Sequence, residues 1–349
     1  MAVRLTLNGR PYTSRHNNSI HHDRHGPLPA RAQPAGPPAA GPVRGGPVPL
    51  PGARDVEAPE GGDRRRRVAA ALAELDHLVG LGHVKALIYE LHAFAEIQQR
   101  RREANLAAEP LVMHMTFRGN PGTGKTTVAR ILARILKEMG VLSRGHLVEV
   151  ERADLVGEYI GHTAQKTRSQ IQKALGGVLF IDEAYSLARG GEKDFGREAI
   201  DTLVRALEQH RENLVCILAG YRAEMEWFLL QNPGLRSRFP IHLDFPDYTH
   251  DELLAIAEVM LARRQYRLTA DARARLAAYL RDLPERGRRD AGNARTVRNL
   301  IERALRRQAV RLVQGPYQPG REELMAITAA DVEAALRDEG PPAQPPLYN

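Results

Sequence analysis

The chain of 349 residues has a single cysteine, Cys216, and contains no uninterrupted apolar run of 18 residues. One cysteine cannot form a disulfide within the chain, and a lone thiol suits a reducing compartment. The absence of a long apolar run predicts that no helix spans a membrane. The N-terminal stretch also lacks the apolar core of a secretory signal. We therefore expect a cytoplasmic protein.

Basic charge is concentrated near the N-terminus, and the formal net charge of the chain is +8. Residues 1–67 hold 11 arginines and 5 acidic residues, which leaves +6 on this segment. The rest of the chain holds 39 basic and 37 acidic residues, which leaves only +2. A groove for nucleic acid requires its excess positive charge on the folded body. The charge distribution therefore argues against nucleic acid as a partner.

Both ends of the chain have the composition of flexible segments. Residues 26–62 contain 10 prolines and 8 glycines, a composition that buries too little apolar surface to fold. Residues 1–62 and 339–349 are therefore predicted to be a flexible N-terminal segment and a disordered tail. The first segment also carries four histidines, and a metal site is the alternative to a solvated tail for them: His16, His21, His22 and His25. No cluster of cysteines or carboxylates accompanies them, which favours the tail.

The body of the chain alternates apolar β-type runs with helical patterns. Strands are expected at 111–117, 146–150, 178–181, 214–218 and 241–243. Helices are expected near 83–107, 125–139, 164–175, 196–210 and 222–230. Alternation of this kind is typical of a parallel sheet with helices on both faces. We expect an α/β domain with N-terminal helices at 63–247.

After residue 251 the β-type runs stop and only helical patterns follow. They lie near 250–265, 269–281, 293–313 and 328–338. Apolar residues at helical spacing, without strands between them, favour a small helical bundle. We therefore expect a small α-helical domain at 248–338.

The segment from Gly119 to Thr126 matches the phosphate-loop pattern G-x-x-x-x-G-K-[ST] between a predicted strand and a predicted helix. Glycines let backbone N–H groups surround an anion, and the N-terminus of the helix adds a favourable dipole. We expect Lys125 to contact the β- and γ-phosphates and the hydroxyl of Thr126 to bind Mg²⁺. The predicted nucleotide contacts are Gly119, Asn120, Pro121, Gly122, Thr123, Gly124, Lys125, Thr126 and Thr127.

Two carboxylates follow the apolar run 178–181. A buried strand brings Asp182 and Glu183 to the carboxyl edge of a parallel sheet, where ligands bind in open α/β folds. Asp182 is expected to hold Mg²⁺ through water, and Glu183 to polarise the attacking water. An apolar run that ends in Asp-Glu is weak evidence alone. Its place after the phosphate loop, with one strand between them, makes it strong.

Arginines form two further candidate sites. Arg236 and Arg238 follow the fourth predicted strand in NPGLRSRFP, and planar guanidinium groups suit phosphoryl oxygens. They either pair with nearby carboxylates or reach a γ-phosphate in a neighbouring subunit, and spacing leaves both interpretations open. Arg295 opens a predicted helix in GNARTVRN. It either contacts phosphate or forms an ordinary exposed helix start.

A loop between the second predicted strand and the next helix carries two apolar residues between glycines. Its sequence VGEYIGH places Tyr159 and Ile160 between Gly157 and Gly161. Glycines on both sides favour a mobile loop with an exposed apolar tip. In the alternative, Tyr159 packs onto its own domain.

Together these segments resemble the AAA+ ATPases: GNPGTGKTTVAR, ERADLVGEYIGHTAQKT, GGVLFIDEAYSLARGGEKDFGREAIDTLV, ILAGY, NPGLRSRFP and GNARTVRN. Within that family the match is to the group that contains red-type Rubisco activase and stage V sporulation protein K, over about residues 72–330. The resemblance implies a P-loop sheet followed by a helical lid, with ATP and Mg²⁺ as cofactors. It also implies a homo-oligomeric ring, a hexamer, that hydrolyses ATP at subunit interfaces and remodels a protein substrate.

The resemblance also implies roles for particular residues at the nucleotide. Arg238 matches the arginine finger, with Arg236 secondary, and Arg295 matches the lid sensor. Gly80, in the segment 79–81, matches the lining of the adenine pocket. The family pattern often places Asn after the fourth strand as a first sensor, whereas this chain has Tyr221 there. Tyr221 is therefore only a candidate for that role.

Two loops match segments that grip polypeptide in the family. Tyr159, Ile160 and Gly161 match its aromatic–hydrophobic–glycine pore loop, and residues 189–195 fall where a second pore loop lies. The main hypothesis is an ATP-driven protein remodeller in bacterial endospore formation or spore maturation. The alternatives are an activase-like remodeller of a metabolic enzyme and a DNA-acting, loader-type ring, which the near-neutral body disfavours. A binding module without turnover is disfavoured because Glu183 and Arg238 are both present.

We expect Lys125→Ala to abolish nucleotide binding, and Glu183→Gln to keep binding but lose turnover. The first side chain holds phosphate, whereas the second activates water. Nucleotide affinity and ATP hydrolysis measured on both variants check this expectation. Strong turnover by Glu183→Gln would contradict the assignment of the catalytic base.

Overall fold

The computed structural model describes residues 60–108, 112–159, 161–190, 194–282 and 292–338, all of which belong to one compact unit. Several expectations lie outside the described residues. They are the flexible segment before residue 60 with its histidines, the tail 339–349, Ile160 of the first loop and residues 191–193 of the second. Within the described ranges, no helix combines the length and apolarity needed to cross a membrane.

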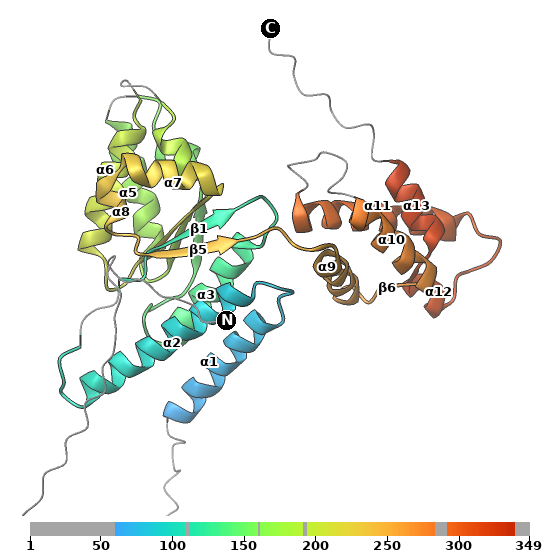
Figure 1. Cartoon of the computed structure of the whole chain (residues 1–349), viewed down its shortest axis with the longest axis horizontal. Coiled ribbons are helices and arrows are strands. Elements are labelled where there is room, and N and C mark those ends of the chain that lie inside the picture. The colour runs from blue at the N-terminus through green and yellow to red at the C-terminus, as the bar shows by residue number, and fades with distance from the viewer. Residues whose placement is uncertain (1–59, 109–111, 160, 191–193, 283–291, 339–349) are drawn as a thin grey trace, which may run out of the picture. The chain divides into compact units, whose positions relative to one another are not determined.

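Five parallel strands form the central sheet, in the order β2-β3-β4-β1-β5. Figure 1 shows β1 beside β5 at one side of this sheet. Their bounds are β1 Met115–Gly119, β2 Leu147–Val150, β3 Val178–Ile181, β4 Val215–Gly220 and β5 Ile241–Phe245. The predicted parallel α/β sheet is therefore confirmed. The first strand begins later than expected, because Met113 and His114 are buried without joining the ladder. Apolar sequence indicates burial rather than strand pairing.

Helices cover both faces of the sheet, and the central strands β3 and β4 are buried on both sides. Adjacent residues Ile217 and Leu218 are both fully buried, yet they enter opposite cores. The first core packs against α1 (Glu60–Asp76), α2 (Gly82–Glu103) and α3 (Lys125–Glu138). The second packs against α4 (Arg152–Leu155), α5 (His162–Ala174), η1 (Ala184–Ala188), α6 (Gly196–Gln209), α7 (Arg222–Gln231) and α8 (Pro233–Arg236). Near-continuous apolar strands are the usual consequence of burial on two faces.

The helix after the phosphate loop is fixed by its buried side. In α3 the residues Val128, Ile131, Leu132 and Ile135 are almost inaccessible to solvent, and they recur at intervals of three and four. This spacing puts them on one helical face, which packs on the sheet. The start of α3 at Lys125 is thereby held beside the carboxyl end of β1.

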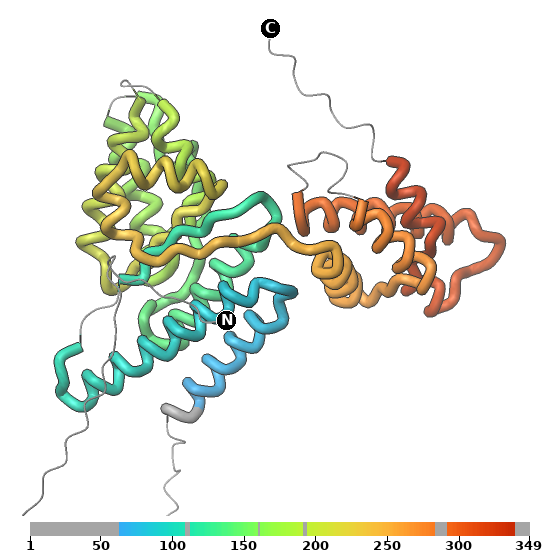
Figure 2. Tube along the Cα trace, in the orientation of Figure 1, coloured from blue at the N-terminus to red at the C-terminus, as the bar shows by residue number. Residues whose placement is uncertain are grey.

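The C-terminal part of the chain forms its own helical bundle with a separate core, coloured orange to red in Figure 2. Its main helices are α9 (His250–Ala262), α10 (Ala270–Asp282), α11 (Asn293–Val313) and α13 (Ala329–Arg337). The expectation that strands stop after residue 251 was wrong. Two short strands, β6 (Arg267–Leu268) and β7 (Ala326–Ile327), pair in parallel. β6 leads into α10, and α12 (Arg321–Met325) leads into β7. Two-residue strands are too short to produce a recognisable periodicity.

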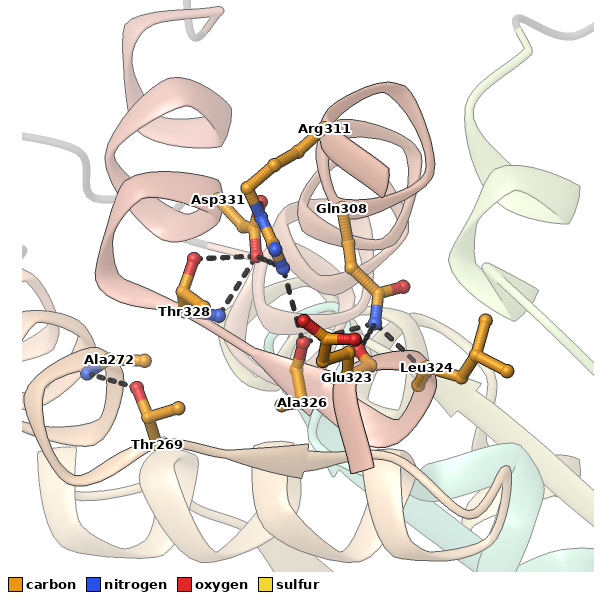
Figure 3. A network of polar contacts seen from close by, with 9 residues as sticks. All are labelled: Thr269, Ala272, Gln308, Arg311, Glu323, Leu324, Ala326, Thr328 and Asp331. Carbon is orange, nitrogen blue, oxygen red and sulfur yellow. Dashed lines mark hydrogen bonds and ion pairs between the residues drawn. The ribbon is translucent and has the colours of Figure 1, made fainter. Parts of the chain in front are cut away.

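A buried polar network fixes the segment around β7 (Figure 3). The carboxylate of Asp331 accepts hydrogen bonds from Arg311 at 2.9 Å and from the backbone and hydroxyl of Thr328 at 2.9 and 2.8 Å. Gln308 donates to the carbonyls of Glu323, Leu324 and Ala326. Burial acts to raise the pKa of Asp331, but the bonds from Arg311 and Thr328 outweigh it and lower that pKa.

We expect Asp331→Asn to reduce the free energy of local opening of α13 by about 1–3 kcal/mol at pH 7, because a buried charged hydrogen-bond acceptor is lost. The lowered pKa means that this stabilisation is complete above the unfolded value of about 3.9 and is lost as pH falls through the folded pKa. Hydrogen exchange of α13 amides measures it. The matched control is Asp338→Asn, an exposed partner of Arg307, which should change little. Equal protection in both variants would contradict the role of the network.

Candidate nucleotide site

The phosphate loop joins β1 to α3 and is closed by its own lysine. Lys125 Nζ donates to the carbonyls of Gly119 at 2.7 Å and Asn120 at 2.8 Å. Gly122 and Gly124 have φ values of 75° and 97°, in the left-handed region where side chains are strained. The glycines of the motif are thus required by backbone conformation, as the sequence predicts.

Asp182 and Glu183 follow β3 directly, at the carboxyl edge of the sheet. The backbone N–H of Glu183 donates to the Asp182 carboxylate at 3.0 Å. Glu183 has a φ of 49°, a left-handed conformation that costs a residue with a side chain about 1–2 kcal/mol. Strain of this kind is characteristic of functional positions held by the surrounding structure. The turn brings Glu183 out of the line of its strand.

The charges of the phosphate-loop lysine, the acidic pair and Arg295 act on one another. Burial lowers the pKa of Lys125, and the charge of Arg295 lowers it further, while Asp182 and Glu183 oppose both. Burial raises the pKa of Glu183, as does the charge of Asp182, while Lys125 and Arg189 oppose the rise. The fold therefore brings together the phosphate loop, the acidic pair and the first turn of α11.

Residues at the junction with the helical domain complete this site, and sequence reasoning missed three of them: Asp247, Tyr248 and Asn293. The Tyr248 hydroxyl donates to the Thr123 carbonyl at 3.1 Å, and Asn293 donates to the Asp247 carboxylate at 2.8 Å. The available signal was their position beside recognised features. Asp247 and Tyr248 directly precede the capping box that starts α9, and Asn293 precedes Arg295 by two residues.

The predicted adenine segment lies against the same junction. A side chain at Gly80 would overlap the Glu252 carboxylate and contact the ring of Tyr248. The next residue, Leu81, is buried with a φ of 56°, and its side chain lies beside Gly124. The structure therefore places this turn next to the phosphate loop, and the role of Gly80 in lining an adenine pocket stays a prediction.

The two arginines that are candidates for the arginine finger differ in their contacts and their exposure within the single chain. Arg238 donates to the Gly234 carbonyl at 3.1 Å and pairs with Glu208 of α6 at 3.2 Å. Its Nε is buried without a hydrogen-bond partner among the described residues. Arg236 is exposed on α8. A contact between either arginine and a neighbouring subunit remains a prediction.

The remaining predicted residues lie on the loops around the sheet edge. Tyr221 follows β4 and is half-buried, with its ring 6.3 Å from that of Tyr185. Tyr159 is 66% exposed, and its ring lies edge-on to that of His162, with the ring centroids 5.6 Å apart. The alternative in which Tyr159 packs into its own domain does not describe this geometry. Gly161 adopts a φ of 84° immediately before α5.

Comparison with known families decides the class of the protein. Residues 115–247 match the family described as the ATPase family associated with various cellular activities (AAA), and residues 249–341 match the AAA lid domain. The chain belongs to the AAA ATPase family. It is an enzyme that binds and hydrolyses ATP, and its helical domain is an AAA lid.

Several curated proteins are similar over most of their length. Stage V sporulation protein K of Bacillus subtilis is 53% identical over 74% of this chain and 80% of its own. Protein CbxX (plasmid) of Cupriavidus necator is 48% identical over 80% and 89%. The chloroplastic ribulose bisphosphate carboxylase/oxygenase activase of Cyanidioschyzon merolae is 44% identical over 77% and 92%. A solved variant of Thermotoga maritima RuvB has a TM-score of 0.50 at 21% identity, covering 76% and 72% of the chains, which shows the fold alone.

We expect kcat for ATP hydrolysis to fall as pH decreases through the raised pKa of Glu183, because a general base must be unprotonated. Arg189→Ala removes a charge that lowers this pKa and should move the acidic limb of the profile to higher pH. Arg205→Ala, an exposed arginine on α6, is the control and should leave the limb in place. If the pH profiles of kcat for the wild type, Arg189→Ala and Arg205→Ala were superimposable, Glu183 would be excluded as the group that titrates.

Proposed function

We propose that this AAA ATPase is a protein remodeller that works as a homo-oligomeric ring and grips its polypeptide substrate with Tyr159. The observation that carries this proposal is the exposure of Tyr159 on a loop with a fixed base. The N–H of Gly157 donates to the Thr163 hydroxyl at 3.0 Å, and Lys166 donates to the carbonyls of Ala153 and Val156. A large aromatic side chain left in solvent on an anchored loop suits transient apolar contacts.

The chemistry at the sheet edge supplies the driving reaction. In this proposal Lys125 and the N–H groups of the phosphate loop bind the phosphates. Thr126 and Asp182 offer a hydroxyl and a carboxylate, the hard oxygen ligands that suit Mg²⁺. A Mg²⁺ ion held by them would neutralise negative charge on the phosphates. Glu183, whose pKa is raised by burial, accepts a proton from the attacking water.

A hexameric ring supplies the remaining catalytic group in this proposal. Arg238 acts as the finger on the nucleotide of the adjacent subunit, with Arg236 beside it. Two features of the single chain support this role for Arg238. Its bond to the exposed carboxylate of Glu208 is the kind of surface pair worth only about 0–1 kcal/mol, and its Nε has no hydrogen-bond partner within the described part of the chain. An approaching phosphate can therefore replace Glu208 at small cost.

The biological setting that we propose is bacterial endospore formation or spore maturation. It is supported by the 53% identity to a protein named for stage V of sporulation. The second candidate, remodelling of a metabolic enzyme, is favoured by a relative named as a ribulose bisphosphate carboxylase/oxygenase activase. A DNA-acting ring is disfavoured because residues 68–349 carry a formal charge of only +2.

We expect Tyr159→Ala to leave folding, nucleotide binding and basal hydrolysis near wild type, and to abolish substrate capture. An exposed tip contributes little to stability, and it holds no catalytic group. Thermal melts and ATPase assays of the full chain check the first part. A loss of about 3–5 kcal/mol in stability, the usual cost of removing a buried aromatic side chain, would refute the exposed-loop interpretation.

Substrate capture tests the function directly. Glu183→Gln should hold ATP without turnover, so that bound polypeptide is retained. Proteins co-purified with Glu183→Gln from sporulating cells are compared with those from the double variant Glu183→Gln/Tyr159→Ala. Spore proteins present only in the first sample support the proposal. A metabolic enzyme as the Tyr159-dependent partner would favour the second candidate, and identical samples would refute a grip by Tyr159.

A further inference from the structure

Every backbone carbonyl of the phosphate loop, from Gly119 to Gly124, accepts a hydrogen bond. Lys125 occupies the first two, and the first turn of α3 occupies the last at 2.9 Å. The three carbonyls between them belong to Pro121, Gly122 and Thr123. Their partners lie at least 125 positions later in the sequence. The middle of the loop is thus held by other parts of the fold.

The three partners come from the junction and the lid. The Tyr248 hydroxyl donates to the Thr123 carbonyl at 3.1 Å. The side-chain amide of Asn293 donates to the Pro121 carbonyl at 3.3 Å, and the backbone N–H of Ala294 donates to the Gly122 carbonyl at 3.2 Å. Tyr248 lies between β5 and α9, whereas Asn293 and Ala294 begin α11.

These bonds set the direction of the N–H groups that face a phosphate. In a trans peptide the carbonyl and the following N–H point in opposite directions, and no cis peptide occurs among the described residues. A carbonyl held from outside therefore turns the N–H of the next residue toward the inside of the loop. The residues oriented in this way are Gly122, Thr123 and Gly124.

Asn293 is itself fixed by several contacts. It is 5% exposed, it donates to the Asp247 carboxylate at 2.8 Å, and its oxygen accepts from the Tyr248 N–H at 3.0 Å. Asp247 also accepts from the side chain of Asn120 in the phosphate loop at 3.0 Å. Asn293 has a φ of 45°, a conformation that Asn and Asp tolerate better than most residues. Its amide thus links loop, junction and lid.

We propose that Tyr248 and Asn293 are positioning residues that hold the phosphate loop in its anion-binding conformation, so that lid docking and nucleotide binding strengthen each other. The proposal rests on the assignment of the phosphate loop as the nucleotide site. Coupling between two binding equilibria is reciprocal. A nucleotide that fixes the inward N–H groups therefore also tightens the bonds from α11, and with them the position of Arg295.

Two conservative variants remove these bonds separately. Tyr248→Phe deletes one hydroxyl, and its matched control is Tyr266→Phe, at a half-buried tyrosine of the lid. Asn293→Asp keeps the size and backbone preference of the side chain but turns a donor into a carboxylate facing Asp247. Its matched control is Asn299→Asp, the same substitution at an exposed position of α11. Lys125→Ala reports on the nucleotide site itself.

The measured quantities are the affinity and dissociation rate of a fluorescent ADP on the full chain, and hydrogen exchange with and without ADP. Tyr248→Phe should weaken binding about 2–12-fold, the range expected for one neutral hydrogen bond. Asn293→Asp should weaken it about 10-fold or more, because it adds like-charge repulsion to the lost bonds. Both control variants should stay within about twofold of wild type.

Hydrogen exchange separates positioning from general stability. In the wild type, ADP should protect both the phosphate-loop amides and the first turn of α11, and each variant should reduce the two protections together. If Asn293→Asp unfolds the lid, Tyr248→Phe decides the question because it deletes a single oxygen atom. Binding by Tyr248→Phe equal to that of Tyr266→Phe would overturn the proposal. Normal binding by Lys125→Ala would instead overturn the nucleotide-site assignment on which it rests.

Discussion

A phosphate loop binds an anion only while its peptide N–H groups converge, and this requires partners for the carbonyls on the other side of the same peptides. In this chain those partners come from three places: the loop's own Lys125 and Thr123, the first turn of α3, and the later residues Tyr248, Asn293 and Ala294. The first two are local, whereas the third needs the whole chain to fold. The phosphate loop is therefore held both by the α/β domain and by residues of the junction and the lid.

Gly122 shows why this arrangement permits so little variation. A side chain there would overlap the carbonyl of Gly292 and crowd the backbone N of Arg295. The glycine thus serves two purposes: it allows the left-handed turn of the loop, and it lets the start of α11 approach closely. Backbone flexibility and tertiary packing select the same residue.

The acidic pair is connected to the loops by a short helix. Glu183 caps the beginning of η1 in a strained conformation, and Arg189 ends it with its guanidinium over the ring of Tyr185 at 4.5 Å. Arg152, at the start of α4, donates to the Ser186 carbonyl at 2.6 Å and pairs with Asp194 at 2.5 Å. The helix that precedes the first predicted pore loop therefore contacts both η1 and Asp194 of the second predicted loop.

The sequence determined the elements whose signals are local. Alternation of apolar runs and helical patterns was enough for the parallel sheet and most helix positions, because burial on two faces imposes a continuous apolar composition. The phosphate loop and the acidic pair could equally be predicted from the sequence, since their chemistry depends on residues close in sequence.

The tertiary structure alone decided the rest. The β6–β7 pair is too short to leave a pattern, and Tyr248 and Asn293 act on a loop more than 120 positions away. The ion pair between Arg238 and Glu208 could not be predicted from the spacing of residues, because it forms only when α6 packs beside α8. Contacts between distant segments depend on how the elements pack, and no local pattern in the sequence records that.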